Sequence, residues 1–224
     1  MLSKSQKPSE TQRGSTLKEK YGDWSIVIGA SEGLGSEWAN LFCENGLNVI
    51  TVARRQNELE AKAQELRDRH GCLVKTVLLD LSDGENVSKI LESTFNDYNV
   101  GLMVYNAAAF KKGYFLDNLN DHLLAVEVNV ASLTRAVYAF GNAAKANVRK
   151  SSGIIIMSST LGDKGAATIS SYAASKAYDT VLAQSLANEM QEAGIDVLAC
   201  VAGPLKHQIS VEPMEKIHKI LTLC

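Results

Sequence analysis

Six short apolar runs, separated by longer amphipathic stretches, are the feature that most limits how this chain can fold. Near-continuous hydrophobicity marks each run as a strand buried on both faces, the pattern of a parallel sheet. The runs lie at residues 24–28, 47–53, 73–79, 101–105, 153–157 and 195–201. Helices are expected at 34–45, 55–70, 84–97, 118–148 and 171–193, several followed by a glycine. This alternation predicts an α/β fold built on a doubly wound parallel sheet with right-handed crossovers.

Composition favours a single domain and argues against binding to nucleic acid or insertion in a membrane. The 224 residues are 46% hydrophobic and 21% charged, which suits a single globular domain. We expect a flexible tail at 1–20, a single α/β domain at 21–209 and a short C-terminal segment at 210–224. A net charge of −2 gives no basic field to attract nucleic acid. Glu127, Arg135 and Asp196 interrupt the most hydrophobic regions, so no integral membrane segment is expected.

The cysteines and the N-terminal segment favour a cytoplasmic location. The four cysteines, at positions 43, 72, 200 and 224, lie far apart, and the first three fall in expected helix or strand. That placement favours free thiols in a reducing compartment. The first twenty residues are rich in Ser, Lys and Gln, like a solvated tail rather than a secretion signal. The four histidines show no metal-ligand spacing with the cysteines, so no metal is expected.

A glycine-rich turn joins the first expected strand to the first long helix. It reads Gly29-Ala30-Ser31-Glu32-Gly33-Leu34-Gly35. Glycines at these places allow a tight turn and a close approach of the backbone to a pyrophosphate, with amide donors at the helix N-terminus. A loose turn is the alternative interpretation, but the position between strand and helix favours phosphate binding. The fold is therefore expected to be of the Rossmann type, with its ligand beyond the carboxyl ends of the strands.

Tyr172 and Lys176 lie one helical turn apart, and Tyr172 follows Ser159 by thirteen positions. Residues four apart share a helix face, so the Lys176 ammonium would lie near the phenol. Bringing a tyrosine pKa from ~10 to neutrality takes about 4 kcal/mol, which one ammonium at ~4 Å supplies in a partly screened site. Tyr172 would then serve as a general acid or base. Taken singly, Tyr172 could be a core residue, Ser159 a turn residue and Lys176 half of a surface ion pair.

The spacing of the glycines resembles that of the short-chain dehydrogenase/reductase family, and the resemblance covers about residues 21–209. Asp80 and Leu81 resemble the family's adenine-contacting element. Asn106 begins a segment similar to the family's Asn-Ala-Gly element, with Ala108 where glycine is usual. Four residues match the catalytic tetrad in order and spacing: Asn129, Ser159, Tyr172 and Lys176.

The resemblance implies a role for each residue of the tetrad. Tyr172 would donate a proton to a substrate carbonyl oxygen, and Ser159 would orient that oxygen. Lys176 would lower the Tyr172 pKa and hold the nicotinamide ribose, while Asn129 would support a water that passes protons to Lys176. The implied reaction is hydride transfer between a nicotinamide cofactor and a carbonyl or secondary alcohol substrate.

The end of the second strand indicates which cofactor is used. An acidic residue about 20 positions beyond the glycine turn normally binds an unphosphorylated ribose. This chain has Ala53, Arg54 and Arg55 there. A guanidinium matches a 2′-phosphate in charge and in paired donors, so NADP is favoured over NAD. The alternative is that both arginines merely begin a solvated helix, which suits Arg55 better than Arg54.

Other segments agree with the family in part. Gly203 and Leu205 fall in a segment similar to the one that holds the nicotinamide carboxamide, where Ala202 replaces the usual proline and His207 a common threonine. Residues 21–24 resemble the hydroxysteroid and 3-ketoacyl reductase branch. Family helices like those at 118–148 and 171–193 pair subunits, which implies a homodimer or homotetramer.

The part that follows Gly203, about twenty residues, is short for the family. We expect the 195–201 strand to be an exposed edge unless a helix at 211–223 or a partner subunit covers it. Because the family's covering segment is shortened, the substrate is predicted only as a carbonyl or alcohol. A non-catalytic, cofactor-binding or truncated relative of the family is the alternative function.

Overall fold

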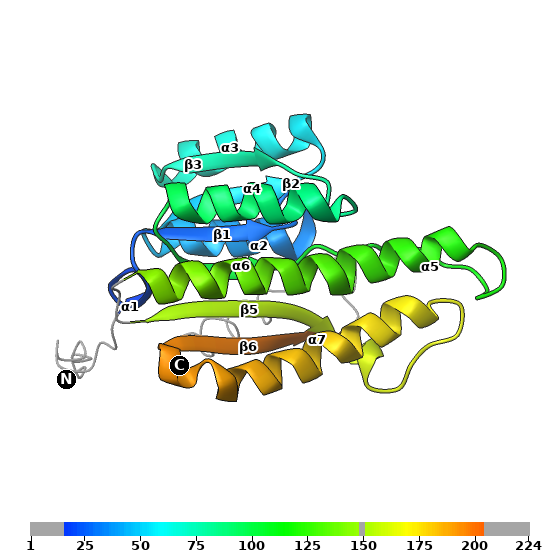
Figure 1. Cartoon of the computed structure of the whole chain (residues 1–224). Helices are drawn as coiled ribbons and strands as arrows, with labels where there is room; N and C mark the ends of the chain where they lie inside the picture. Colours follow the sequence, from blue (N-terminus) through cyan, green and yellow to red (C-terminus); the bar gives the residue numbers. More distant parts are fainter. Residues whose placement is uncertain (1–15, 148–150, 204–224) are drawn as a thin grey trace, which may run out of the picture.

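The computed structural model describes residues 16–147 and 151–203, and in them a six-stranded parallel sheet lies between two layers of helices (Figure 1). The strand order is β3-β2-β1-β4-β5-β6. The strands are β1 (Trp24–Ile28), β2 (Asn48–Ala53), β3 (Val74–Leu78), β4 (Val100–Tyr105), β5 (Ser152–Ser159) and β6 (Ile195–Ala202). The order reverses between β1 and β4, so the predicted doubly wound fold is confirmed, with strand bounds within one or two residues of the apolar runs.

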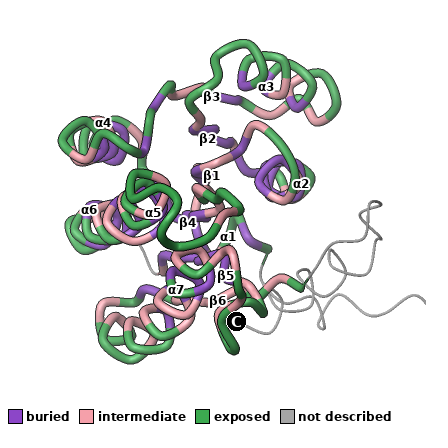
Figure 2. Tube along the Cα trace, turned by 90° about the vertical axis from the view of Figure 1, so that its right-hand side faces the viewer, coloured by how far each residue is buried: buried purple, intermediate pink, exposed green. Residues whose placement is uncertain are grey.

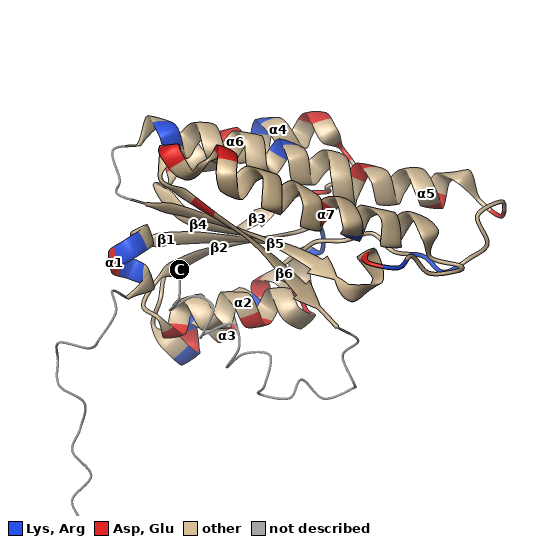
Figure 3. Cartoon of the chain, turned by 90° about the horizontal axis from the view of Figure 1, so that it is seen from below, with Lys and Arg blue, Asp and Glu red and all other residues tan. Residues whose placement is uncertain are grey.

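Helices cover both faces of the sheet. The long helices are α2 (Gly33–Glu44), α3 (Gln56–His70), α4 (Gly84–Asp97), α5 (Leu119–Val126), α6 (Ser132–Ala146) and α7 (Ser170–Glu189). The short ones are α1 (Leu17–Tyr21), the π-helical turn η2 (Glu127–Ala131), and the 3₁₀ turns η3 (Thr160–Gly162) and η4 (Gln191–Ala193). Figures 2 and 3 show α2 and α3 on one face and α4, α6 and α7 on the other, with the charged residues mostly on the helices.

The core forms two apolar layers because successive strand residues point to opposite faces. Ile26 and Ile28 of β1 belong to the cluster that includes Phe140 of α6. Val27, between them, belongs to the cluster that includes Trp38 of α2. All three β1 residues are fully buried, and burial of this kind stabilises a domain by about 1.5–3 kcal/mol per large side chain. The rigid sheet fixes the positions of the strand ends, where the site residues lie.

The N-terminal boundary differs from the expected one. Helix α1 begins at Leu17, inside the segment expected to be a tail up to residue 20. Thr16 and Glu19 form a reciprocal capping box, which explains why so short a helix begins there. Tyr21 is buried and its hydroxyl donates to Asp196 of β6 at 2.8 Å. The domain therefore includes α1, and residues 1–15 lie outside the described part of the chain.

The helical segment Leu119–Ala146 corrects the expectation that no apolar stretch is long enough to span a membrane. These 28 residues, comprising α5, η2 and α6, are long and apolar enough by length and composition, despite Glu127 and Arg135. Half of the most apolar window is buried in the fold. Its buried residues include Leu133, Ala136 and Phe140, which pack in the core cluster on the sheet. Packing against the sheet accounts for this apolar content.

Cys43 and Cys72 form a disulfide, contrary to the expectation of free thiols. Their Cα atoms are 5.8 Å apart although they are 29 positions apart in sequence. In right-handed parallel crossovers the helices on one face run the same way, so the C-terminal ends of α2 and α3 lie at the same edge of the sheet. Sequence spacing alone did not reveal this proximity. Cys200 is a free thiol whose pKa is raised by burial.

Reduction of the Cys43–Cys72 disulfide is expected to lower the free energy of unfolding by about 3 kcal/mol, because the closed loop restricts the unfolded chain. Denaturant unfolding with and without a thiol reductant measures this. The Cys43→Ser variant is the control, since its stability should not respond to the reductant. An equal effect of the reductant on both chains would contradict the pairing.

Beyond β5 the chain has one further described strand. β6 pairs in parallel with β5 from Ser152↔Ile195 to Ser159↔Ala202 and forms one end of the sheet among the described strands. The helix expected at 211–223 lies outside the described residues, so what covers β6 stays a prediction.

Candidate active site

The glycine turn brings the ends of β1 and β4 into close contact. Gly29 has a φ of +89°, and a Cβ there would come 2.6 Å from the backbone nitrogen of Ala107. A Cβ on Gly35 would come 1.9 Å from the carbonyl oxygen of Gly29. That oxygen accepts a hydrogen bond from Asn106 Nδ2 at 2.9 Å. The turn therefore needs glycine at both positions, and Asn106 holds it from the next strand.

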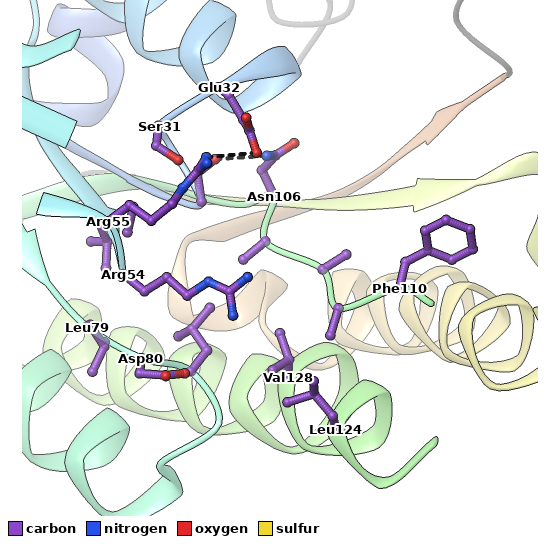
Figure 4. Close-up of a pocket in the computed structure, with 17 residues that line it drawn as sticks. Ser31, Glu32, Arg54, Arg55, Leu79, Asp80, Asn106, Phe110, Leu124 and Val128 are labelled. Carbon is purple, nitrogen blue, oxygen red and sulfur yellow. Dashed lines mark hydrogen bonds and ion pairs between the residues drawn. The ribbon is translucent and has the colours of Figure 1, made fainter. Parts of the chain in front are cut away.

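The N-terminus of α2 is open to an anion. Its N-cap residue, Glu32, makes no side-chain capping hydrogen bond. The first amide groups of a helix need an outside acceptor, which a phosphate supplies together with the favourable helix dipole. Gly33 and Leu34 are the first residues of this helix, and the Ser31 side chain lies at the turn (Figure 4). These residues fit the pyrophosphate of a dinucleotide cofactor.

A cleft of about 480 Å³ lies beyond the carboxyl ends of β1, β2, β3 and β4 (Figure 4). It is lined by Gly29, Ser31, Glu32, Val52, Ala53, Arg54, Arg55, Leu79, Asp80, Leu81, the residues from Asn106 to Phe110, Leu124 and Val128. Six of the thirteen residues predicted to bind the cofactor therefore share one cavity: Gly29, Ser31, Arg54, Asp80, Leu81 and Asn106. Gly35 packs closely against the Gly29 carbonyl oxygen of the turn. Gly33 and Leu34 are the first residues of α2, which begins directly after the turn.

The two arginines at the end of β2 have different surroundings. Arg55 forms ion pairs with Glu32 at 3.0 Å and with Glu58 at 3.5 Å, and its pKa is raised chiefly by the hydrogen bond to Glu32. Among the described residues, no carboxylate lies within ion-pair distance of Arg54, whose guanidinium extends into the cleft (Figure 4). Arg54 is thus available to a ligand anion. The Glu32 contact was missed because Glu32 and Arg55 meet only through the tertiary fold.

Asp80 is held as a carboxylate at the rim of the cleft. Its Oδ1 accepts hydrogen bonds from the Ser82 backbone nitrogen at 2.9 Å and the Ser82 hydroxyl at 2.8 Å. These bonds lower the Asp80 pKa, with a smaller contribution from the charge of Arg54. The carboxylate therefore keeps a fixed orientation beside Leu81, as an adenine-contacting residue would require.

Asn129 connects three elements at the other end of the cleft. It is 1% exposed and lies in the π-helical turn η2, a distortion often found at functional sites. Its Oδ1 accepts from the Ala109 backbone nitrogen at 2.6 Å, and its Nδ2 donates to the Ala109 carbonyl oxygen and to Ser175 Oγ, both at 3.0 Å. The side chain thus fixes the loop after β4 against α7. The water-supporting role implied by the family stays a prediction.

Ser159, Tyr172 and Lys176 come together where β5 ends and α7 begins. The Tyr172 ring meets Phe110 edge-on at 5.3 Å, and Phe110 also lines the cleft. Burial raises the Tyr172 pKa, a hydrogen bond with Ser159 lowers it, and the charge of Asp179 raises it. The net shift is upward, with burial as its largest cause. That Lys176 lowers this pKa stays a prediction.

The position of the Lys176 ammonium bears on that prediction. Its Nζ lies 5.6 Å from the Tyr172 ring centroid, as the helical spacing predicted. It also donates to the Met157 carbonyl oxygen at 2.6 Å and to Asp179 Oδ2 at 2.7 Å. The Asp179 carboxylate offsets the positive charge that would otherwise stabilise a phenolate. Asp179 was missed as a site residue, although its spacing of three from Lys176 is one that brings helix residues together.

Two residues predicted to contact the cofactor, Gly203 and Leu205, lie at or beyond the end of the described residues. Gly203 follows β6 and is exposed, while Leu205 lies outside the described residues. In the described ranges 16–147 and 151–203, no group of three or more His, Cys, Asp or Glu side chains is arranged to hold a metal ion.

These features define a doubly wound sheet with a glycine-rich turn after β1 and with a serine, a tyrosine and a lysine where β5 ends and α7 begins. A family model described as short chain dehydrogenase matches residues 23–217. The chain belongs to the short-chain dehydrogenase family. Its curated relatives include a 7beta-hydroxysteroid dehydrogenase of Mediterraneibacter gnavus, 30% identical over 189 residues, which covers 84% of this chain and 71% of the relative. This similarity places the chain near the hydroxysteroid branch of the family.

Other relatives differ in activity and in bound ligand. The human inactive hydroxysteroid dehydrogenase-like protein 1 is 27% identical over 188 residues, covering 83% of this chain and 56% of that protein. A solved 7beta-hydroxysteroid dehydrogenase has a TM-score of 0.80 and 25% identity, with 92% of this chain and 86% of that one covered. A short-chain dehydrogenase of Sphingobium yanoikuyae in complex with NADPH has a TM-score of 0.77 and 26% identity, with 82% and 72% covered.

Proposed function

We propose that the protein is an NADP(H)-dependent oxidoreductase that transfers hydride between the nicotinamide and a carbonyl or secondary alcohol. The observation that carries the proposal is the convergence of Ser159, Tyr172 and Lys176 at the carboxyl end of β5, beside a cleft whose far end fits a dinucleotide. Ligands of doubly wound sheets bind at this edge. When bound, the cofactor supplies the hydride.

The protein's own residues would orient the substrate and move one proton. Ser159 and Tyr172 would both hydrogen-bond the substrate oxygen, and the Tyr172 hydroxyl would give its proton to that oxygen during reduction. Phe110, packed on the Tyr172 ring, would exclude water from one side of the reacting group. Lys176 would contact the ribose, and Asn129 would keep the loop that borders the cleft in place.

Arg54 is the residue that we expect to select NADP(H). Arg54→Ala should weaken NADPH binding by about 10- to 100-fold, because a charge-assisted contact contributes about 1.5–3 kcal/mol. NADH binding should change little, because NADH has no 2′-phosphate. Fluorescence titration with both cofactors measures the two effects.

Arg55→Ala is the matched control for Arg54→Ala, since Arg55 is adjacent in sequence but already paired with Glu32 and Glu58. It should lose much less NADPH affinity than Arg54→Ala. Equal losses of NADPH and NADH affinity in Arg54→Ala would contradict the assignment and favour NAD.

The substrate is proposed to carry apolar surface next to its reacting carbon. Phe110 and Leu124 line the cleft, and both have exposed surface. Tyr114, Phe115 and Leu116, from the loop that follows Phe110, are also exposed. The 7beta-hydroxysteroid dehydrogenase relative is named for a substrate of this kind. A hydroxysteroid or a similarly bulky ketone is therefore the first substrate class to assay.

We further propose a homodimer or homotetramer formed through the helical segment Leu119–Ala146 and α7. Leu119, Tyr138 and Val181 are large apolar residues exposed on these helices. Sedimentation tests this association. A cytoplasmic location is also proposed, although the Cys43–Cys72 disulfide removes the argument from free thiols. Cytoplasmic thiols are usually kept reduced, so finding Cys43 and Cys72 reduced in intact cells would support this location and finding them oxidised would contradict it.

A cofactor-binding protein without catalysis is the second candidate. The pairing of Lys176 with Asp179 favours it, as does similarity to a relative named as inactive. Assays of NADPH oxidation with a panel of bulky ketones separate the two functions. Turnover supports the oxidoreductase, whereas NADPH binding without turnover of any ketone supports the second candidate.

A further inference from the structure

Lys176 and Asp179 form an ion pair beneath the candidate active site. Lys176 is 4% exposed and Asp179 is 2% exposed, and their charged atoms are 2.7 Å apart. Asp179 Oδ1 is buried without a hydrogen-bond partner among the described residues. Buried ion pairs of this kind are often no more stabilising than apolar residues of similar volume. Stability alone therefore gives little reason for an aspartate at this position.

The pair fixes where the lysine points. Two of the three donors of the Lys176 ammonium can be assigned, one to Asp179 and one to the carbonyl oxygen of Met157 on β5. Met157 lies two positions before Ser159, so the ammonium is held between α7 and the sheet at the level of the site. Only the remaining donor is left for a ligand hydroxyl or for the phenol.

We infer that Asp179 is a positioning residue that holds the Lys176 ammonium against the Met157 carbonyl and offsets its positive charge next to the Tyr172 phenol. Burial of the phenol acts in the same direction, so the phenol is expected to stay protonated near neutral pH. The direction of catalysis follows from this and rests on the proposed oxidoreductase function. In reduction, the phenol gives its proton to the substrate oxygen while the carbonyl carbon accepts the hydride. In oxidation, a phenolate must take the hydroxyl proton while the hydride leaves the carbon. A protonated Tyr172 therefore favours ketone reduction at neutral pH.

The other charged and titratable groups packed around α7 have their own partners. Tyr105 of β4 donates to the Val128 carbonyl oxygen at 2.6 Å, and its pKa is raised first by burial and then by the charge of Asp179. Glu127 of η2 pairs with Arg135 at 2.6 Å. On α5, His122 contacts Ser171 Oγ at 2.9 Å.

Three further titratable groups lie on elements that pack against α7, although not all of them face it. Lys111, in the loop before α5, pairs with Asp121, and Asp196 of β6 pairs with Lys20. Cys200 of β6 packs against the cluster on the opposite face of the sheet. Among the described residues, Asp179 is the charge that acts on the Tyr172 pKa.

The test replaces the Asp179 carboxylate by an amide of the same shape, Asp179→Asn. Tyrosinate formation is then measured by spectroscopic pH titration without cofactor or substrate. The original chain and Asp179→Asn are each compared with the same chain carrying Tyr172→Phe, so that the difference reports the Tyr172 phenol alone. We expect the Tyr172 midpoint to move to lower pH. The rate of alcohol oxidation at pH ~7 should rise about tenfold per pH unit of that shift, mainly in kcat, and the oxidation profile should move in parallel.

Glu189→Gln is the matched control, because it removes one negative charge from an exposed position on the same helix. It should leave the Tyr172 midpoint unchanged. Asp179→Leu is a second variant, in which an apolar side chain replaces the carboxylate. It should shift the Tyr172 midpoint in the same direction as Asp179→Asn.

An unchanged or higher Tyr172 midpoint in folded Asp179→Asn would overturn the inference. Failure of both Asp179 variants to fold, with Glu189→Gln folded, would also overturn it by making Asp179 purely structural. A lowered midpoint supports the inference whether or not any ketone is turned over. The titration and the activity assay therefore separate a failure of this inference from a failure of the proposed function.

Discussion

Tyr172→Phe is expected to lower kcat for ketone reduction by about 1,000-fold, because a positioned proton donor contributes about 10²- to 10⁴-fold to a rate. Phenylalanine keeps the ring that packs edge-on against Phe110, so the fold and the cleft should be preserved. NADPH affinity should change much less than kcat. Steady-state rates and NADPH titration on the same preparations measure the two quantities.

Tyr178→Phe is the control for the loss of a tyrosine hydroxyl on the same helix. The Tyr178 hydroxyl hydrogen-bonds Thr134 Oγ1 at 2.7 Å, away from Ser159 and Lys176. Its removal should leave kcat within about twofold, since an exposed hydrogen bond contributes only ~1 kcal/mol of stability. Equal rates for the original chain and Tyr172→Phe would remove the catalytic role of Tyr172.

Gly35→Ala is expected to have the largest effect on the folded structure. The added Cβ would lie 1.9 Å from the Gly29 carbonyl oxygen and 2.7 Å from Asn106 Nδ2. The oxygen belongs to backbone, which can move only by displacing the end of β1. We expect the free energy of unfolding to fall by about 3 kcal/mol or more, and NADPH binding to be lost. Denaturant unfolding and cofactor titration measure these effects.

Gly113→Ala is the matched control for Gly35→Ala. A Cβ at Gly113 would meet its nearest neighbour, the Asp117 carboxylate, at an ordinary 3.5 Å. This variant should keep both stability and NADPH binding. If Gly35→Ala were as stable as Gly113→Ala and still bound NADPH, the close approach of α2 to the turn would be contradicted.

Much of the fold could be predicted because strands that are buried on both faces are apolar at nearly every position. The run Trp24–Ile28 is apolar at nearly every position since β1 is covered on both faces. The helix Gly84–Asp97 has the bounds that were predicted for it, and the structure shows an N-cap at Asp83 and a non-helical conformation at Tyr98. The phosphate turn was predictable because only glycine fits its geometry.

The side-chain pairings within the site could not be predicted in the same way. Lys176 and Asp179 are close in sequence, but an i,i+3 pair is usually an exposed pair, and the pattern of α7 does not show that both are buried. The contacts of Asn129 with Ala109 and Ser175 join residues from three separate elements. Such contacts depend on where the sheet places each element, which single-sequence patterns do not specify.

The disulfide between Cys43 and Cys72 is another contact between separate elements that the sequence pattern did not predict. Cys43 lies in the last turn of α2 and Cys72 in the loop that follows α3, and spacing alone gave no reason to pair them. The helix Leu119–Ala146 illustrates the opposite case, because its apolar content is visible in sequence but its packing on the sheet is not. Both corrections come from the arrangement of helices on the two faces of the sheet.

Hydride transfer itself gives the most direct test of the central claim. The protein would be incubated with NADPH deuterated on the nicotinamide and with bulky ketones, and the alcohol products analysed by mass spectrometry. We predict deuterium on the carbinol carbon with the original chain and nearly none with Tyr172→Phe. Absence of deuterated alcohol with every ketone, or equal labelling by both chains, would contradict the account.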